Sequence, residues 1–403
     1  MAPKFGTSGL RGLVTELTEP LVQDYVRAFL AACPTGGAVH VGYDLRPSAP
    51  RIAAMVRTAV LHEGLDIHDC GAVPTPALAL ASMARGHGAV MVTGSHIPAD
   101  RNGLKFYVPT GEISKADETA ILDHLGRSPA GGAAGRHHDG QGAVAAYTAR
   151  YVDAFGAQAL AGWRIGVYQH SSVARDIMMD VVQSLGGTPL ALAPSDVFIP
   201  VDTEALDAST REMLANWCST HALDAVISTD GDADRPMVAD ASGTIIPGDI
   251  LGALTAQSLG ADVICTPVSS NSMIADMPAF KAIHLTRIGS PFVIAAMENV
   301  LQDAPQARVV GYEANGGFLL GFTARGPAGD LTPLMTRDCL LPMLAPMAAA
   351  RQAGVGLAAH AATLPQRFTA ADRLAGIPSD AAQAFLQRLS GQALRDAHHR
   401  FAP

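Results

Sequence analysis

The stretch Val90-Met-Val-Thr-Gly-Ser-His-Ile-Pro-Ala-Asp-Arg-Asn-Gly-Leu-Lys-Phe-Tyr107 places a small hydroxyl side chain directly after a buried strand. The apolar run at 89–92 predicts that strand, and 104–108 predicts a second strand after a tight turn at Asn102-Gly103. In open α/β sheets, ligands bind at the carboxyl ends of the strands. The sequence therefore predicts that Ser95 is presented at such a site.

His96 and Lys105 follow Ser95 within a few residues, so an ionisable partner is available to the hydroxyl. The nucleophile elbow G-x-S-x-G of lipases is excluded, because Thr93 and Ile97 stand where its glycines would be. An ordinary surface serine is the alternative that this stretch alone leaves open.

A second stretch, 224–235, reads Asp-Ala-Val-Ile-Ser-Thr-Asp-Gly-Asp-Ala-Asp-Arg and ends another strand-like run with Asp230, Asp232 and Asp234. Clustered carboxylates repel one another unless a cation holds them. Three hard oxygen ligands suit Mg²⁺ or Ca²⁺ better than softer metals. The spacing therefore indicates a divalent cation site.

An EF-hand loop is excluded for this stretch. It needs glycine at its sixth position and glutamate at its twelfth, where Arg235 and Ala241 stand. Two alternatives stay open at this point: a solvated acidic loop, and a phosphatase in which the Asp230 carboxylate attacks phosphorus.

Composition fits a large globular protein. With 403 residues and about 150 residues per domain, two to four domains are expected. Hydrophobic residues make up 48% and charged residues 16%, so the chain can bury large cores. The 28 Lys and Arg against 37 Asp and Glu give a net charge of −9, so no basic face is indicated and nucleic acid is not an expected partner.

The cysteines and the apolar runs indicate a cytoplasmic protein. The five cysteines are scattered without C-x-x-C spacing, so neither a zinc site nor a redox motif is indicated. The first residues lack the apolar core of a signal peptide, and no apolar run approaches the ~20 residues needed to span a bilayer. We therefore expect no membrane partner and a reducing compartment.

Strands and helices alternate along the chain, which predicts α/β layers. We expect three successive units at 1–140, 141–246 and 247–358, each with a polar loop after an apolar strand. The glycine-rich linker at 128–142 sets the first boundary. In the third unit we expect one long helix at 330–351.

Four separated motifs resemble those of the α-D-phosphohexomutase family. Residues 93–98 match T-[AG]-S-H-x-P, and residues 230–235 match D-G-D-x-D-R. Residues 5–12 (Phe-Gly-Thr-Ser-Gly-Leu-Arg-Gly) match a loop near the start of the family's chains, and 311–317 (Gly-Tyr-Glu-Ala-Asn-Gly-Gly) are similar to its sugar-binding loop. The resemblance covers residues 5 to about 372 and implies three consecutive α/β/α-layered domains of phosphohexomutase type.

The resemblance also implies a fourth domain with a phosphate-binding loop, R-x-S-G-T/N-x-P. Residues 367–372 resemble its first strand and 378–395 are predicted to form a helix, but no such loop follows before Pro403. We therefore expect 359–403 to be a partial C-terminal domain, through truncation or through loss of a substrate-phosphate clamp.

The activity that the resemblance implies is reversible transfer of a phosphoryl group between C6 and C1 of a hexose phosphate. Ser95 would carry the phosphoryl group, with a hexose 1,6-bisphosphate as intermediate and activator. Loops 94–97 and 313–317 are most similar to those of bacterial phosphomannomutases. A glucose-specific or dual-specificity mutase, a Mg²⁺-dependent sugar phosphatase and a non-catalytic sugar-phosphate binder stay open, and the chain is expected to be a monomer or dimer.

The resemblance assigns expected roles to individual residues. Mg²⁺ would be held by Ser95 and the three aspartates, and Lys105 or His96 would relay the proton of a sugar hydroxyl. The remaining expected contacts, with phosphate charge or with the sugar, come from Arg11, Arg235, Arg287, Ser290, Glu313 and Asn315.

Overall fold

The computed structural model of the chain describes residues 3–6, 9–369 and 377–389. The chain divides into a compact unit that ends at Phe368 and a second unit that begins at Thr369. In the second unit, α12 spans Ser379–Leu389, which lies inside the helix predicted at 378–395. Residues 390–395 of that prediction, and 370–372 of the strand predicted at 367–372, lie outside the described residues.

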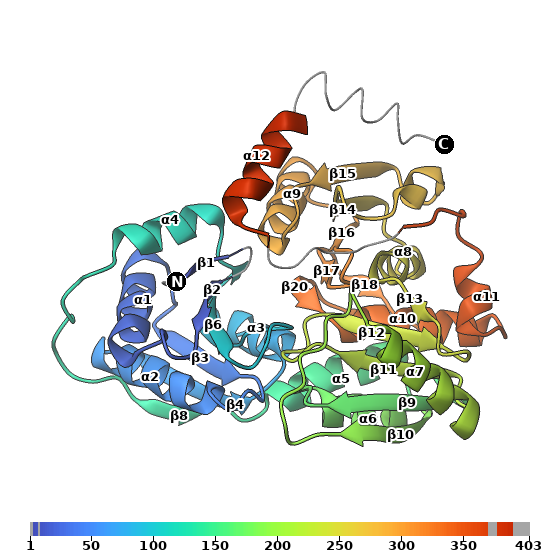
Figure 1. Cartoon of the computed structure of the whole chain (residues 1–403), viewed down its shortest axis with the longest axis horizontal. Coiled ribbons are helices and arrows are strands. Elements are labelled where there is room, and N and C mark those ends of the chain that lie inside the picture. The colour runs from blue at the N-terminus through green and yellow to red at the C-terminus, as the bar shows by residue number, and fades with distance from the viewer. Residues whose placement is uncertain (1–2, 7–8, 370–376, 390–403) are drawn as a thin grey trace. The chain divides into compact units, whose positions relative to one another are not determined.

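The first sheet of the larger unit is mixed, with helices on both faces. Its elements are β1 (Lys4–Phe5), β2 (Leu10–Leu13), α1 (Glu19–Ala32), β3 (Ala38–Tyr43), α2 (Ala49–His62), β4 (Asp66–Ala72), α3 (Thr75–Met83), β5 (Gly88–Val92), β6 (Arg101–Val108), β7 (Gly111–Glu112), α4 (Lys115–Asp123) and β8 (His137–Asp139). The strand order is β1-β2-β6-β5-β3-β4-β8, with β7 paired to β6. α1 and α3 lie on opposite faces of this sheet (Figure 1).

The second sheet has the order β10-β9-β11-β12-β13, in which β12 alone runs antiparallel to the other strands. Its elements are α5 (Ala143–Phe155), β9 (Arg164–His170), α6 (Arg175–Ser184), β10 (Thr188–Pro194), α7 (Ala208–His221), β11 (Ala225–Thr229), β12 (Pro236–Asp240) and β13 (Ile245–Ile246). α6 packs on one face in the largest apolar core, and α7 packs on the other face in a separate core.

The third sheet has the order β15-β14-β16-β17-β20. Its elements and neighbours are α8 (Gly248–Ser258), β14 (Val263–Pro267), the 3₁₀ helix η1 (Ser272–Asp276), β15 (Ala282–Thr286), α9 (Ser290–Asp303), β16 (Val309–Tyr312), β17 (Phe318–Leu320), the paired β18 (Ala324–Arg325) and β19 (Asp330–Leu331), β20 (Leu334–Asp338), α10 (Leu340–Gln352) and α11 (Leu357–Ala361). This alternation of sheets and helices confirms the predicted α/β fold class.

Each sheet falls within one of the predicted ranges 1–140, 141–246 and 247–358, while the boundaries themselves stay predictions. The second and third sheets share the largest apolar core, which includes α5, α8 and α10. A buried polar contact joins the same segments: the Tyr147 hydroxyl donates to Asp338 Oδ1 at 2.5 Å, and the Tyr151 hydroxyl donates to Asp338 Oδ2.

The long helix predicted at 330–351 is wrong. Residues 330–338 form β19 and β20, and only the part from Leu340 is helical. Pro333 explains the difference: it lacks a backbone N–H and disfavours helical conformation in the residue before it. Antiparallel pairing of β20 with β17 instead completes the third sheet.

The tight turn predicted at Asn102-Gly103 is also wrong, because both residues lie in β6 and pair with Gly12 and Arg11 of β2. A Cβ on Gly103 would lie 2.0 Å from the Leu10 carbonyl oxygen, so glycine here allows close strand approach. The segment 5–12, expected as a loop, contributes strands β1 and β2.

The linker predicted at 128–142 contains a strand, β8, which pairs in parallel with β4 at the edge of the first sheet. Its histidines are therefore held in a defined register.

In the part of the chain that the structure describes, no helix is both long and apolar enough to cross a bilayer. All five cysteines are free thiols.

Candidate active site

The serine loop is built on the carboxyl end of β5. Thr93 Oγ1 accepts the backbone N–H of Ser95 at 2.7 Å and donates to Asp44 Oδ2 at 2.6 Å. Ser95 has φ 55°, a left-handed conformation that non-glycine residues seldom adopt, and its side chain is buried. The loop therefore holds one hydroxyl in a fixed and strained position.

Arg46 holds this strained loop in place, and sequence reasoning missed it. Its guanidinium donates to four backbone carbonyl oxygens at donor–acceptor distances of 2.6–3.1 Å: those of Ser95, Ile97 and Pro98 in the loop, and that of Arg101 at the start of β6. It pairs with Asp44 at 3.2 Å and lies over the Phe198 ring. A Cβ on Gly94 would lie 2.5 Å from Arg46 Cζ, so Gly94 leaves room for the guanidinium.

Arg46→Met is expected to lower the free energy of unfolding by about 3–5 kcal/mol, because the buried Asp44 carboxylate loses its counter-charge. Urea unfolding measures this loss. The double variant with Asp44→Asn should recover part of it, and the exposed Arg51→Met should stay within about 0.5 kcal/mol of wild type. A loss for Arg46→Met no larger than that for Arg51→Met would contradict this role.

The aspartate loop follows β11 in the second sheet. Asp230, Asp232 and Asp234 are buried, and one carboxylate oxygen of each lies within 4.8 Å of the others. Ala233 has φ 58°, so this loop, like the serine loop, contains a non-glycine residue in the left-handed conformation. The Ser95 hydroxyl donates to Asp230 Oδ2 at 2.6 Å, so the structure brings the serine and aspartate loops together.

Cations from two other strands contact the aspartates. Lys105 Nζ, from β6, lies 2.6 Å from Asp232 Oδ2 and 2.5 Å from Asp234 Oδ2. Arg337 Nη2, from β20, lies 2.7 Å from the same Asp234 oxygen, and the Thr75 hydroxyl donates to Asp232 Oδ2. The Oδ2 atoms of Asp232 and Asp234 are thus each contacted by two donor groups.

The other oxygens of the cluster fit a bound cation. Asp232 Oδ1 and Asp234 Oδ1 are buried and have no hydrogen-bond partner among the described residues. A buried carboxylate oxygen is costly unless it is paired or coordinates a metal. These two atoms, with Asp230 and the Ser95 hydroxyl beside it, form an oxygen-rich donor set of the kind that Mg²⁺ prefers.

The pKa values reflect the charge in the cluster. Burial raises the pKa of Asp230 well above its usual range, and the neighbouring Asp232 and Asp234 carboxylates raise it further. Burial would also raise the pKa of Asp232, but the charge of Lys105, the hydrogen bonds from Lys105 and Thr75, and the charge of Arg11 together lower that pKa. Lys105 therefore compensates the charge of Asp232, whereas the charged form of Asp230 is disfavoured in this cluster.

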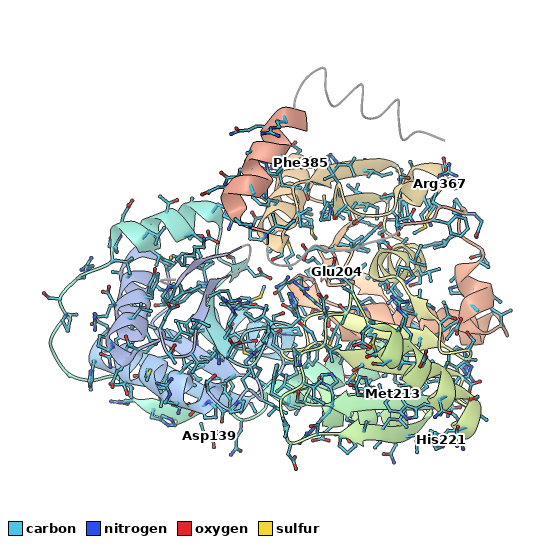
Figure 2. All side chains as sticks on the ribbon, viewed as in Figure 1. Asp139, Glu204, Met213, His221, Arg367 and Phe385 are labelled. Atoms are coloured by element: carbon cyan, nitrogen blue, oxygen red, sulfur yellow. The ribbon has the colours of Figure 1, made fainter. Side chains whose placement is uncertain are left out.

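Three further predicted residues lie at this site. His96 Nδ1 is 3.4 Å from Ser95 Oγ, and burial together with Arg235 lowers the His96 pKa to about 4, so its ring is neutral at pH 7. Arg11 Nη1 donates to the Thr93 carbonyl at 2.5 Å. Arg235 follows the aspartates and lies 3.8 Å from Glu204, which is labelled in Figure 2.

The predicted sugar loop follows β16. A tight turn closes it, in which the Gly316 N–H donates to the Glu313 carbonyl and Gly317 N–H donates to Asn315 Oδ1. Arg337 Nη1 lies 3.4 Å from Glu313 Oε2 and its Nη2 pairs with Asp234, so one guanidinium links this loop to the aspartate loop.

The loop at 287–290 is not joined to these contacts. The Ser290 hydroxyl donates to Glu112 Oε2 at 2.7 Å, and the exposed Arg287 lies over the Phe292 ring. Across the described ranges, no hydrogen bond or ion pair links Arg287 or Ser290 to Ser95 or to the aspartate loop.

Sequence reasoning missed four residues that complete the site: Asp44, Arg46, Thr75 and Arg337. Asp44 and Arg46 follow β3 as a polar loop after an apolar strand, the same signal that identified Ser95. Arg337 was hidden because its segment was assigned to a helix. Thr75 offered no sequence signal.

The assembled groups define what the site can do. A buried hydroxyl touches a carboxylate beside two carboxylate oxygens that have no hydrogen bond from the described residues. Arg11, Lys105 and Arg235 lie around them, and Arg235 Nε is 3.8 Å from one of these oxygens, Asp234 Oδ1. Such a site can hold a divalent cation, offer one oxygen nucleophile, and bind an anionic group through local cations on a chain of net charge −9.

Comparison with known proteins supports the motif resemblance. Residues 2–129 match the family description "Phosphoglucomutase/phosphomannomutase, alpha/beta/alpha domain I". The chain is 44% identical over 402 residues to a phosphomannomutase of Sinorhizobium fredii, covering 96% of this chain and 84% of that protein.

Two solved structures share the fold. A phosphoglucomutase/phosphomannomutase family protein from Burkholderia thailandensis matches with TM-score 0.72 and 19% identity, covering 90% of this chain and 80% of that one. An N-acetylphosphoglucosamine mutase of Aspergillus fumigatus, in complex with glucose 1,6-bisphosphate, matches with TM-score 0.54 and 14% identity, covering 91% and 80%. The motifs, the fold and the identity over nearly the whole chain agree: this protein belongs to the phosphoglucomutase/phosphomannomutase family, the α-D-phosphohexomutases.

Proposed function

We propose that this protein is a phosphomannomutase-type isomerase that interconverts hexose 6-phosphates and hexose 1-phosphates, with mannose phosphates preferred. The contact between Ser95 Oγ and Asp230 Oδ2 carries the proposal, because it joins a nucleophile to a cation site. The 44% identity to a protein named phosphomannomutase supports the choice of sugar. The reducing cytoplasm and a monomer or dimer are part of this proposal, and the free thiols fit that compartment.

In this proposal Ser95 carries a phosphoryl group. A sugar hydroxyl oxygen attacks phosphorus, the bond between phosphorus and Ser95 Oγ breaks, and a hexose 1,6-bisphosphate forms. The bisphosphate then reorients so that its other phosphate faces Ser95. Oγ attacks that phosphorus, the bond between phosphorus and the sugar oxygen breaks, and the sugar oxygen regains a proton from the proton carrier, Lys105 or His96. A distant relative binds glucose 1,6-bisphosphate, which supports an intermediate of this class.

The phosphoserine adds about −1.5 to −2 charges beside three carboxylates. When bound at Ser95, Asp230, Asp232 and Asp234, Mg²⁺ would supply positive charge next to the phosphoryl group and stabilise the serine oxygen as leaving group. Arg11 and Arg235 would stabilise charge on the phosphoryl oxygens; contacts with the Thr93 carbonyl and with Asp234, respectively, support this proposal.

The sugar would be oriented by Glu313 and Asn315. A carboxylate accepts two hydrogen bonds, and an amide both donates and accepts, so the pair suits two adjacent ring hydroxyls. Arg287 and Ser290 are the weaker candidates for substrate binding, because no hydrogen bond or ion pair among the described residues links them to Ser95 or to the aspartate loop. Because the bisphosphate must bind in two orientations, one for each phosphate facing Ser95, the groups that bind the sugar and its phosphates must accept both orientations.

The first experiment is mass spectrometry of the purified protein, followed by an assay with mannose 1-phosphate and a hexose 1,6-bisphosphate activator. We expect phosphate on Ser95 and formation of mannose 6-phosphate. Phosphate on Asp230 with release of free phosphate would indicate a phosphatase, and binding without isomerisation would indicate a sugar-phosphate binder. A kcat/KM for glucose 1-phosphate equal to that for mannose 1-phosphate would contradict the mannose preference.

Lys105→Gln is expected to lower kcat by about 10²–10⁴-fold with a smaller change in KM, because Lys105 is the proposed proton carrier for the sugar hydroxyl. His96→Gln tests the other candidate in the same assay. Since Lys105 also neutralises two buried carboxylates, thermal unfolding in Mg²⁺ must show that the variant is folded. Unchanged turnover in folded Lys105→Gln would remove Lys105 from the mechanism.

A further inference from the structure

Four histidines form a row across the first sheet, away from the phosphoryl site. His40 of β3 is in register with His68 of β4, which is in register with His138 of β8. His87 directly precedes β5, the strand on the other side of β3. The His40 and His68 rings stack with centroids 4.6 Å apart, and the His68 and His138 rings stack at 5.1 Å. The mechanism proposed above uses none of these side chains.

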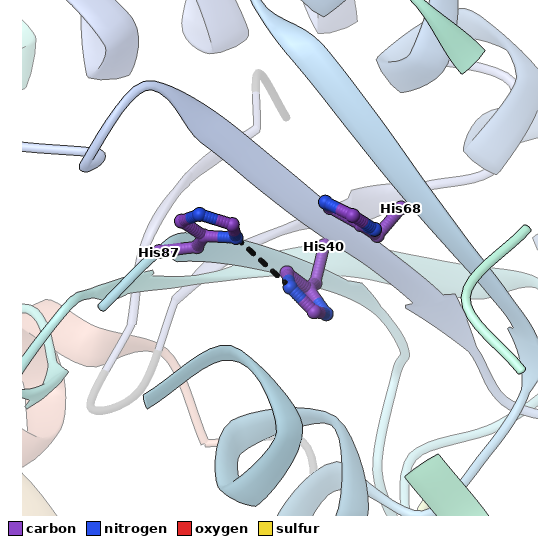
Figure 3. Close-up of side chains that lie close together, drawn as sticks. All are labelled: His40, His68 and His87. Carbon is purple, nitrogen blue, oxygen red and sulfur yellow. Dashed lines mark hydrogen bonds between the residues drawn. The ribbon is translucent and has the colours of Figure 1, made fainter. Parts of the chain in front are cut away.

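Three of these side chains converge closely (Figure 3). One ring nitrogen of each of His40, His68 and His87 lies within 4.8 Å of the others. His40 Nε2 and His87 Nδ1 are 3.3 Å apart. Two nitrogens bound at 2.0–2.1 Å to a tetrahedral ion are themselves about 3.3–3.4 Å apart, so this pair already has the spacing of two zinc ligands.

The surroundings of His40 suit a ligand that binds through Nε2. Its other nitrogen, Nδ1, lies 3.8 Å from Cys70 Sγ, within contact range for a weak hydrogen bond to sulfur. When Nδ1 carries the proton, the lone pair of Nε2 points toward His87. A metal-bound histidine usually donates its second ring N–H to a neighbouring acceptor, which fixes the ring. Cys70 therefore orients His40 rather than completing the set of ligands.

An entry path reaches the cluster. A cavity of about 250 Å³ is lined by His40 and His68, by Arg85 near the end of α3, and by the first turn of α5. His40 is buried, whereas His68 and His87 are half-buried, so an ion can arrive from solvent. The exposed Arg85 opposes a cation, but its long side chain is free to extend into solvent.

We propose that His40, His68 and His87 form a second metal site, selective for a borderline divalent ion such as Zn²⁺. Imidazole nitrogens suit Zn²⁺, whereas the carboxylates of the aspartate loop suit Mg²⁺, so the two sites select different ions. An ion here ties β3 and β4 to the segment before β5 and stabilises the first sheet. The inference goes beyond the mutase activity and does not depend on it.

The test is equilibrium dialysis of the full-length protein against Zn²⁺ with excess Mg²⁺, which keeps the aspartate loop occupied. Metal analysis should find one Zn²⁺ per chain, and titration calorimetry should show at least a tenfold weaker affinity for His87→Gln and for His68→Gln. Zn²⁺ should raise the unfolding temperature of wild type and leave that of His87→Gln nearly unchanged.

His62→Gln is the matched control, because His62 is an exposed histidine in the last turn of α2. It should bind Zn²⁺ as wild type does. Asp230→Asn should also retain the ion, which separates this site from the aspartate loop. The proposal is overturned if wild type retains no Zn²⁺, or if His87→Gln retains it with unchanged affinity. It is also overturned if Asp230→Asn loses Zn²⁺, or if inorganic phosphate rather than Zn²⁺ raises the unfolding temperature of wild type.

Discussion

Ser95→Ala is expected to lower mannose 1-phosphate turnover by on the order of 10⁴-fold or more, the scale seen when a covalent nucleophile is removed. Without Oγ, the protein has no atom at this position to carry the phosphoryl group. The buried contact with Asp230 Oδ2 at 2.6 Å is lost as well. Binding of hexose phosphate should change much less than turnover, because Glu313 and Asn315 are untouched.

Two measurements check this expectation: kcat with saturating bisphosphate activator, and the mass of the protein before and after incubation with that activator. Wild type should gain phosphate and Ser95→Ala should not. Ser82→Ala is the matched control, because Ser82 is also buried but its hydroxyl donates to the Ala79 carbonyl within α3. It should retain wild-type turnover.

If Ser95→Ala kept more than a few per cent of the wild-type kcat, Ser95 could not be the phosphoryl carrier. Phosphate appearing on Asp230 in that variant would favour the phosphatase alternative. Equal losses in Ser95→Ala and Ser82→Ala would point to damage of the first sheet rather than to chemistry, and unfolding temperatures of the two variants separate these cases.

Asp230→Asn is expected to change metal-free stability and activity in opposite directions. In the metal-free protein, burial and the neighbouring Asp232 and Asp234 disfavour the Asp230 carboxylate. Asparagine removes that repulsion, so the free energy of unfolding without Mg²⁺ should rise by about 1 kcal/mol. The Mg²⁺ affinity should fall at least tenfold, or about 1.4 kcal/mol, and kcat by at least about 10²-fold.

The measurements are thermal unfolding with EDTA and with Mg²⁺, and turnover during Mg²⁺ titration. Chelation should abolish turnover of wild type, and added Mg²⁺ should restore it. Asp224→Asn is the matched control, because Asp224 directly precedes β11 whereas Asp230 directly follows it. The Asp224 carboxylate accepts a hydrogen bond from the Arg164 backbone N–H and lies outside the aspartate cluster. It should leave Mg²⁺ affinity unchanged.

A stability loss in metal-free Asp230→Asn would contradict the expected relief of repulsion among the three carboxylates. Full activity of wild type in EDTA would remove the metal from the mechanism. Either result would leave the family membership intact, because that rests on the motifs, the fold and the 44% identity.

The sequence was enough to predict the α/β class and the loops after two apolar strands that carry Ser95 and the three aspartates. These features are local: apolar periodicity and turn residues act over a few positions. The predicted meeting of Ser95 and Asp230 came from the resemblance, and the structure places their side chains 2.6 Å apart.

Only the tertiary structure decided the strand at Asn102-Gly103, the strands that replace the helix expected at 330–338, and the roles of Arg46 and Arg337. Strand pairing joins residues far apart in sequence, so a glycine that permits close approach looks the same as one that makes a turn. Buried guanidinium groups satisfy carbonyls and carboxylates from several segments at once. The histidine cluster has the same origin, since sheet register brings His40, His68 and His87 together without any spacing that a sequence motif would reveal.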